Sequence, residues 1–242
     1  MAGVILEHKS PRPCPLPAYC VRARGKVDKR GLRSSRVSFS PVTEPLALAI
    51  KIAYTLFVAV LIPIYWINYG PLNFLWFSDI ALITSAVAMW VKSPLPASMM
   101  AVAVLVPEVV WNVGFFGRLI FGVDVTGLAG YMFDARIPLY LRLLSLFHVF
   151  MPAVLVWLVC RRGYDPRALG WQVIVVLAVL PVTYLFTRPT DNINWVFGPG
   201  SKPQTAMPPW AYLAVMLVFF PLCIYLPTHL LLLRWMPRSV QR

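Results

Sequence analysis

Charged side chains are scarce in this sequence, and acidic side chains are the scarcest. Only 13% of the 242 residues are charged and nine are Asp or Glu, whereas soluble domains carry about 25% charged residues. Hydrophobic residues reach 59% of the chain, and the mean hydropathy is +0.70. This composition excludes a soluble two-domain enzyme and predicts an integral membrane protein.

Histidines are also few, which limits the metal chemistry that the chain can support. The three histidines are His8, His148 and His229, and the topology predicted below keeps them apart, so a three-histidine zinc site is excluded. A carboxylate-rich metal site at Asp79, Glu108 and His148 is a minor alternative. No nucleotide-binding loop, dinucleotide fingerprint or cysteine pair of metal-binding spacing occurs, so we expect neither a metal nor a cofactor.

Residues 1–44 lack the apolar run that a folded core requires. They contain nine basic and three acidic residues, a net charge of +6, together with five prolines. We therefore predict a disordered cytoplasmic tail that lies near anionic lipid headgroups because of its charge. Nucleic-acid binding is the weaker interpretation, and we expect none. No short basic region is followed at once by an apolar stretch, so no cleavable signal peptide is expected.

Long apolar runs fill the rest of the chain and predict an all-α, polytopic membrane helix bundle. A membrane crossing needs roughly 20 helical residues, and the runs with their breakers divide into six such segments. The predicted crossings are 46–66, 74–91, 96–116, 139–160, 169–186 and 210–233. The six-helix membrane domain is expected over 45–236, with a short cytoplasmic C-terminus at 237–242.

Basic residues set the predicted orientation of these crossings, because cytoplasmic segments carry an excess of Lys and Arg. One side would hold the tail, the second-to-third and fourth-to-fifth connections and the C-terminus, with sixteen basic residues. The other side would hold four, namely Arg118, Arg136, Arg188 and Lys202. Both termini are therefore predicted to be cytoplasmic.

Several ionisable residues fall inside the predicted crossings, where insertion scales put their cost at about 2.5–3.5 kcal/mol each, so they are functional candidates. Asp79, Glu108, Arg142 and His148 all fall in the predicted outer half of the bundle. Asn112 is one helical turn beyond Glu108 and shares its helix face. The sequence therefore predicts an outward-facing polar pocket.

A hydroxyl and an imidazole in this pocket predict ester chemistry. Ser78 would attack an ester carbonyl, His148 would remove the serine proton, and Asp79 or Glu108 would orient or charge the imidazole. With a rise of about 1.5 Å per residue, however, Ser78 would lie about 6 Å and His148 about 13 Å below the starts of their segments. Helix tilt or different helix boundaries must close this gap.

Three other interpretations of the same residues stay open. Ion pairs and hydrogen bonds among them would fix helix packing, as polar residues commonly do between membrane helices. A carrier or channel would use Asp79, Glu108 and His148 to relay protons or bind a small solute. A non-catalytic scaffold would need none of them for its function.

The two predicted outer connections contribute further polar residues. The longer one, 187–209, is rich in turn-forming residues and is either a simple link or a lid over the pocket. Arg188 and Lys202 within it are candidates to bind a phosphate or carboxylate headgroup through charge-assisted hydrogen bonds. With Asn112, Arg142 and Asn194, they complete the predicted substrate-binding residues, and membrane lipid is the expected partner.

Short motifs around these residues resemble a small family of six-span bacterial integral membrane proteins. They are SDIAL at 78–82, His148, NW at 194–195, KP at 202–203 and PPWAY at 208–212. The family is related to androgen-induced hydrolases of branched fatty-acid esters and to a mammalian transmembrane phospholipid acyltransferase. The resemblance implies a bacterial inner-membrane location, a nucleophile at Ser78, where the relatives carry Thr or Cys, and a base at His148.

Overall fold

The computed structural model describes residues 44–239 except Asp124 and Ser201. The predicted basic tail lies outside the described residues apart from Glu44, and so do residues 240–242 of the predicted C-terminus. Over the described ranges the chain is helical and contains no strand. Five helical stretches are long and apolar enough to cross a membrane, so the chain is a multi-pass, all-α membrane protein.

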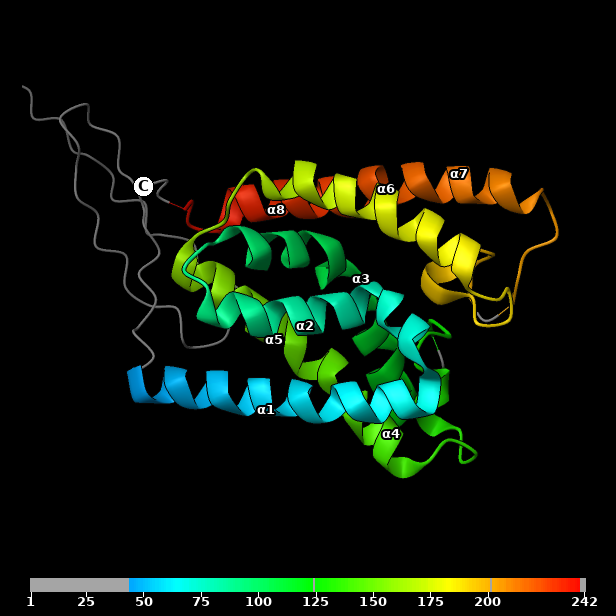
Figure 1. Cartoon of the computed structure of the whole chain (residues 1–242), viewed down its shortest axis with the longest axis horizontal. Helices are drawn as coiled ribbons and strands as arrows, with labels where there is room; N and C mark the ends of the chain where they lie inside the picture. The colour runs from blue at the N-terminus through cyan, green and yellow to red at the C-terminus, as the bar shows by residue number, and fades with distance from the viewer. Residues whose placement is uncertain (1–43, 124, 201, 240–242) are drawn as a thin grey trace, which may run out of the picture. The chain divides into compact units, whose positions relative to one another are not determined.

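The order of elements follows the predicted segments, with differences in where they begin and end (Figure 1). The α-helices are α1 (Glu44–Tyr69), α2 (Phe77–Trp90), α3 (Leu95–Phe121), α4 (Leu139–Leu144), α5 (Phe147–Arg162), α6 (Ala168–Phe186), α7 (Pro209–Phe219) and α8 (Leu226–Trp235). Short helices η1 (Pro71–Leu75), η2 (Gly130–Phe133), η3 (Ile193–Trp195) and η4 (Phe220–Tyr225) lie between them.

The second segment is shorter than its hydropathy predicts. Phe74 belongs to the 3₁₀-helix η1, and Trp76 adopts an extended conformation (φ −58°, ψ 131°) that separates η1 from α2. Hydropathy does not register this break because the residues on both sides are apolar. The predicted helix over 74–91 was therefore wrong at its start. With 14 residues, α2 is about 21 Å long, less than the hydrocarbon thickness of about 30 Å.

Two other predicted helices are interrupted. The fourth segment breaks between α4 and α5 at Ser145, whose hydroxyl donates to the carbonyl of Leu141 and bonds the Tyr65 hydroxyl at 2.8 Å. The last segment contains a π-helical turn, η4, between α7 and α8. Pro221 in this turn lacks a backbone N–H, so a regular ladder of hydrogen bonds cannot pass through it.

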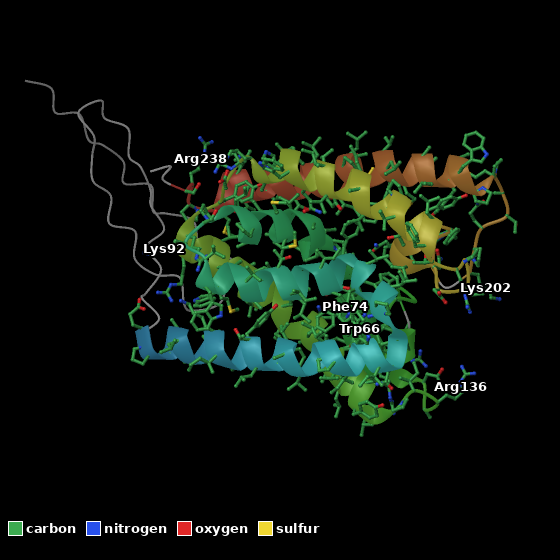
Figure 2. All side chains as sticks on the ribbon, in the orientation of Figure 1. Trp66, Phe74, Lys92, Arg136, Lys202 and Arg238 are labelled. Carbon is green, nitrogen blue, oxygen red and sulfur yellow. The ribbon has the colours of Figure 1, made fainter. Side chains whose placement is uncertain are left out.

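Successive segments run in opposite directions, so the connections between them lie at two opposite ends of the helix bundle (Figure 2). We name them the Lys92 end, where Arg238 also lies, and the Lys202 end, where Arg136 also lies. At the Lys92 end, the Arg162 guanidinium donates to four backbone carbonyls, those of Ala88, Met89, Val91 and Ser93. These hydrogen bonds tie the end of α5 to the end of α2 and to the α2–α3 connection.

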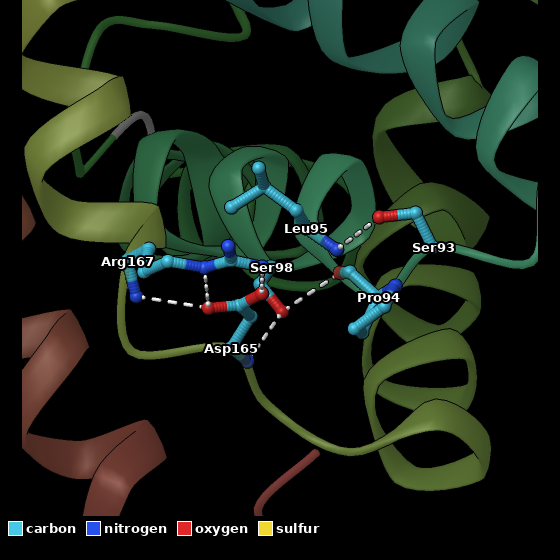
Figure 3. A network of polar contacts seen from close by, with 6 residues as sticks. All are labelled: Ser93, Pro94, Leu95, Ser98, Asp165 and Arg167. Carbon is cyan, nitrogen blue, oxygen red and sulfur yellow. Dashed lines mark hydrogen bonds and ion pairs between the residues drawn. The ribbon is translucent and has the colours of Figure 1, made fainter. Parts of the chain in front are cut away.

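A second polar network at the Lys92 end holds the α5–α6 connection (Figure 3). The buried Asp165 carboxylate accepts hydrogen bonds from the backbone and guanidinium of Arg167, and its own N–H donates to Ser98 Oγ at 3.0 Å. The hydrogen bond from Arg167 holds the pKa of Asp165 below its usual value. Asp165 therefore stays charged at neutral pH and joins α6 to α3.

The helix α3 is the centre of the packing. It contacts α2, α5, α6 and α8. Half of the residues in its most hydrophobic part are buried, a larger share than in any of the other four long helical stretches. Small residues such as Ala97, Ala101 and Ala103 are buried on it and let its neighbours approach closely. This central position explains how α3 carries the buried Glu108 away from lipid.

Candidate functional site

A cavity of about 490 Å³ opens near the Lys202 end of the bundle. Its walls come from α1, η1, α2, α3, the α3–α4 connection, α5, the 190–200 segment and η4. Five of the nine predicted site residues line it, namely Ser78, Asp79, Glu108, His148 and Asn194. The predicted nucleophile, the predicted base and both carboxylates therefore line one cavity.

The breaks in two helices place Ser78 and His148 each in the first turn of a helix. Because α2 begins at Phe77 and α5 begins at Phe147, each residue is the second of its helix. Both line the same cavity. No hydrogen bond joins Ser78 to His148 within the described ranges, and the Ser78 hydroxyl has no other partner there; such contacts are often long before substrate binds.

The His148 imidazole is held by a carboxylate and by aromatic rings. Its Nδ1 lies 2.8 Å from Glu108 Oε2, and Glu108 is only 3% exposed. The ring stacks on Trp111 and Phe147, with centroid distances of 4.5 and 4.1 Å. An ionised carboxylate can only accept a hydrogen bond, so with an ionised Glu108 the proton would lie on Nδ1 and Nε2 would be the basic nitrogen.

Asn112 does not line this cavity but joins the two residues of the pair. Its amide nitrogen donates to the backbone carbonyl of Glu108 at 2.8 Å and to that of His148 at 2.7 Å. The same side chain lines a separate shallow groove on the surface. Asn112, which was predicted to bind substrate, therefore links α3 to α5 through hydrogen bonds to backbone carbonyls.

Asp79 is separate from the His148–Glu108 pair. Its Oδ2 accepts a hydrogen bond from Asn73 Nδ2 at 2.9 Å. The side chain is 3% exposed, and its Oδ1 is buried with no hydrogen-bond partner in the described chain. Of the two carboxylates proposed to orient the imidazole, Glu108 makes the contact.

Asn194 fixes the start of α2 immediately before Ser78. Its Oδ1 accepts from the backbone N–H of Phe77 at 3.0 Å, and its Nδ2 donates to the carbonyl of Leu75 at 2.7 Å. Asn194 and its neighbours Asn192 and Trp195 have left-handed backbones, with φ of 51°, 41° and 56°. Such a conformation is costly for Trp195 and less so for Asn, so this strained turn is maintained by its contacts.

The other three predicted binding residues lie outside the cavity. Arg142 donates to the carbonyls of Ile137 and Met132, at 3.0 and 3.2 Å, and so holds the connection between α3 and α4. Arg188 and Lys202 are exposed. No Lys or Arg lines the cavity, so its walls present no cationic group to a phosphate.

Sequence reasoning missed several cavity residues because no hydropathy signal marks them. Asn73 is a single polar residue among apolar ones, and Tyr65, Trp111 and Tyr131 are indistinguishable from core or interfacial aromatics. Tyr131 lies in the connection between α3 and α4, where burial raises the pKa of its phenol. Residues 191–195, where an aspartate and two asparagines precede a tryptophan, have the composition of an ordered turn.

Among the residues that the structure describes, no group of three or more His, Cys, Asp and Glu side chains is arranged to hold a metal ion. Comparison with family models, curated proteins and solved structures gives no match to the chain. The resemblance to the six-span bacterial family accordingly stays a prediction.

Proposed function

We propose that the chain crosses a bacterial inner membrane six times, with both termini in the cytoplasm. The alternation of helix ends supports this, since α2 runs back between α1 and α3 although it is short. Six basic residues in the described chain fall at the Lys92 end, against four at the Lys202 end, which favours a cytoplasmic Lys92 end. The cavity then faces outward.

Cysteine labelling tests this orientation. In a chain whose native cysteines are replaced by serine, Arg136→Cys and Lys202→Cys should react with a membrane-impermeant maleimide in intact cells. Lys92→Cys and Arg238→Cys should react only after the membrane is permeabilised. Labelling of Lys92→Cys in intact cells, with protection of Lys202→Cys, would reverse the proposed topology.

We further propose that the protein is a lipid-ester hydrolase or acyltransferase with Ser78 as nucleophile. The observation that carries this is the 2.8 Å contact between His148 Nδ1 and Glu108 Oε2 in a cavity that Ser78 also lines. A serine needs a nearby base to become nucleophilic, and a base oriented by a carboxylate is the arrangement that activates it.

The reaction would proceed in two transfers. His148 Nε2 accepts the proton of Ser78 as Oγ bonds to the ester carbonyl carbon, and Glu108 stabilises the resulting imidazolium. The ester C–O bond then breaks, and the leaving alcohol takes the proton from His148. Water, or the hydroxyl of a second lipid, attacks the acyl-Ser78 by the same route in reverse, which regenerates the serine.

The first turn of α2 offers a place for the negative charge that develops on the carbonyl oxygen. The backbone N–H groups of Ser78 and Asp79 have no hydrogen-bond acceptor within the described chain. Free N–H groups at a helix N-terminus favour an anion. Directed at an oxyanion, such donors are among the largest contributions to acyl-transfer catalysis.

Covalent labelling tests the proposed nucleophile. A fluorophosphonate probe should modify the purified protein on Ser78, and Ser78→Ala should abolish the modification. Ser85→Ala is the matched control because Ser85 lies on the same helix, is fully buried and does not line the cavity. Modification that survives Ser78→Ala would rule out this serine as the nucleophile.

A second candidate function is a carrier or channel, and the unpaired Oδ1 of Asp79 favours it. Buried ionisable groups near one another in a membrane commonly relay protons or bind a solute. In that case the fluorophosphonate probe would not label Ser78. Proteoliposomes would instead show solute-dependent proton flux that Asp79→Asn abolishes.

A further inference from the structure

The cavity is lined by acidic residues but not by Lys or Arg. The acidic residues are Asp79, Glu108 and Asp191. Glu108 has His148 as its partner. Asp79, in contrast, has one carboxylate oxygen that is buried and accepts no hydrogen bond from any described residue. A buried oxygen of this kind is costly unless a donor reaches it.

Nine aromatic residues also line the cavity. The aromatic residues lining the cavity are Tyr65, Tyr69, Trp76, Phe77, Trp111, Tyr131, Phe147, Trp195 and Phe220. The faces of such rings attract organic cations, and more strongly where water is excluded. A small metal cation would instead need several ligands at once, and no group of three His, Cys, Asp and Glu side chains in the described chain is arranged to hold one.

We infer that the cavity binds an alkylammonium group, with the Asp79 carboxylate, which lines the cavity, accepting an N–H hydrogen bond and aromatic faces surrounding the carbon atoms. Asn73, bonded to Oδ2, holds the carboxylate in place. The inference rests on the proposed function, because the ammonium group would be part of the ester substrate. The ammonium group can belong to a lipid headgroup or to a free amine.

Binding can be measured without turnover, on the purified full-length chain in a neutral detergent. Thermal unfolding is followed by tryptophan fluorescence with butylammonium chloride, and with butan-1-ol in equimolar sodium chloride. Butylammonium should raise the melting temperature in a saturable manner, and butan-1-ol should not. Equal stabilisation by the two compounds would overturn the inference, because charge would then contribute nothing.

Asp79→Asn tests the residue directly. Loss of a charge-assisted hydrogen bond should weaken butylammonium binding by about 10- to 100-fold. Asp134→Asn is the matched control, since Asp134 is at the same end, pairs with Arg136 and does not line the cavity. Undiminished binding to Asp79→Asn would overturn the inference, and if that variant does not fold, the comparison of butylammonium with butan-1-ol in the wild type still decides.

Further measurements distinguish a lipid headgroup from a free amine as the source of the ammonium group, and distinguish this inference from the proposed enzyme. Lysophosphatidylethanolamine that binds more tightly than butylammonium would point to a lipid headgroup, and the reverse would point to a free amine. Tighter binding of anionic lysophosphatidylglycerol than of either would overturn the inference. Butylammonium binding by a wild-type protein that turns over no lipid ester would contradict the proposed enzyme and leave this inference standing.

Discussion

Replacing His148 by glutamine is expected to lower turnover of a responsive lipid ester by about 10²- to 10⁴-fold, the usual contribution of a positioned general base. Glutamine keeps a polar group beside Glu108 but has no basic nitrogen to accept the Ser78 proton. Glu108→Gln should also lower the rate, because an amide neither fixes the proton on Nδ1 nor stabilises the imidazolium. Initial rates on a lipid ester panel in detergent measure both effects.

The matched control for this substitution is His229→Gln. His229 lies at the Lys92 end, where its ring bonds the Tyr164 hydroxyl, and it does not line the cavity. Turnover should be unchanged in this variant. Full activity in His148→Gln, with the protein folded, would contradict the catalytic assignment and leave the His148–Glu108 contact as a packing feature.

Asn194→Ala is expected to destabilise the protein and impair the site together. The substitution leaves the N–H of the buried Phe77 and the carbonyl of the half-buried Leu75 without partners. Unsatisfied buried groups cost about 1–3 kcal/mol each, so we expect a loss of about 2–4 kcal/mol in the free energy of unfolding. Denaturant unfolding in mixed micelles measures this loss.

Asn68→Ala provides the contrast for Asn194→Ala. Asn68 also makes two side-chain hydrogen bonds, to the Ile64 carbonyl and from the Tyr140 hydroxyl, but it is exposed. Its loss should cost less than about 1 kcal/mol, since solvent or headgroups replace both bonds. Below its unfolding temperature, Asn194→Ala should also react more slowly with the fluorophosphonate probe, because the α2 start moves. Equal destabilisation by both variants would contradict a special role for Asn194.

The sequence was sufficient to predict the helical membrane architecture and the polar cluster. Apolar runs of fixed length are dictated by the membrane, so the long stretches stand out from composition alone. Ionisable residues within them are rare because they are costly, which is why Asp79, Glu108 and His148 were identifiable as a group. The structure places all three around one cavity.

Helix breaks and side-chain partners were beyond such reasoning. The extended Trp76 and the break at Ser145 lie between apolar residues, so hydropathy continues across both. Partner choice depends on tertiary contacts between residues far apart in sequence. Asn112 and Arg142 were predicted to bind substrate, but the structure shows them bonded to backbone carbonyls.

A double-mutant cycle between Ser78 and His148 tests most directly whether the two residues form one chemical unit. Ester turnover is compared among the wild type, Ser78→Ala, His148→Gln and the double variant. When two residues act as one catalytic unit, removing the second costs little once the first is gone. We therefore expect the double variant to turn over ester no more slowly than the slower single variant. Losses that multiply in the double variant, or full turnover in either single variant, would show that the hydroxyl and the imidazole do not work as a pair.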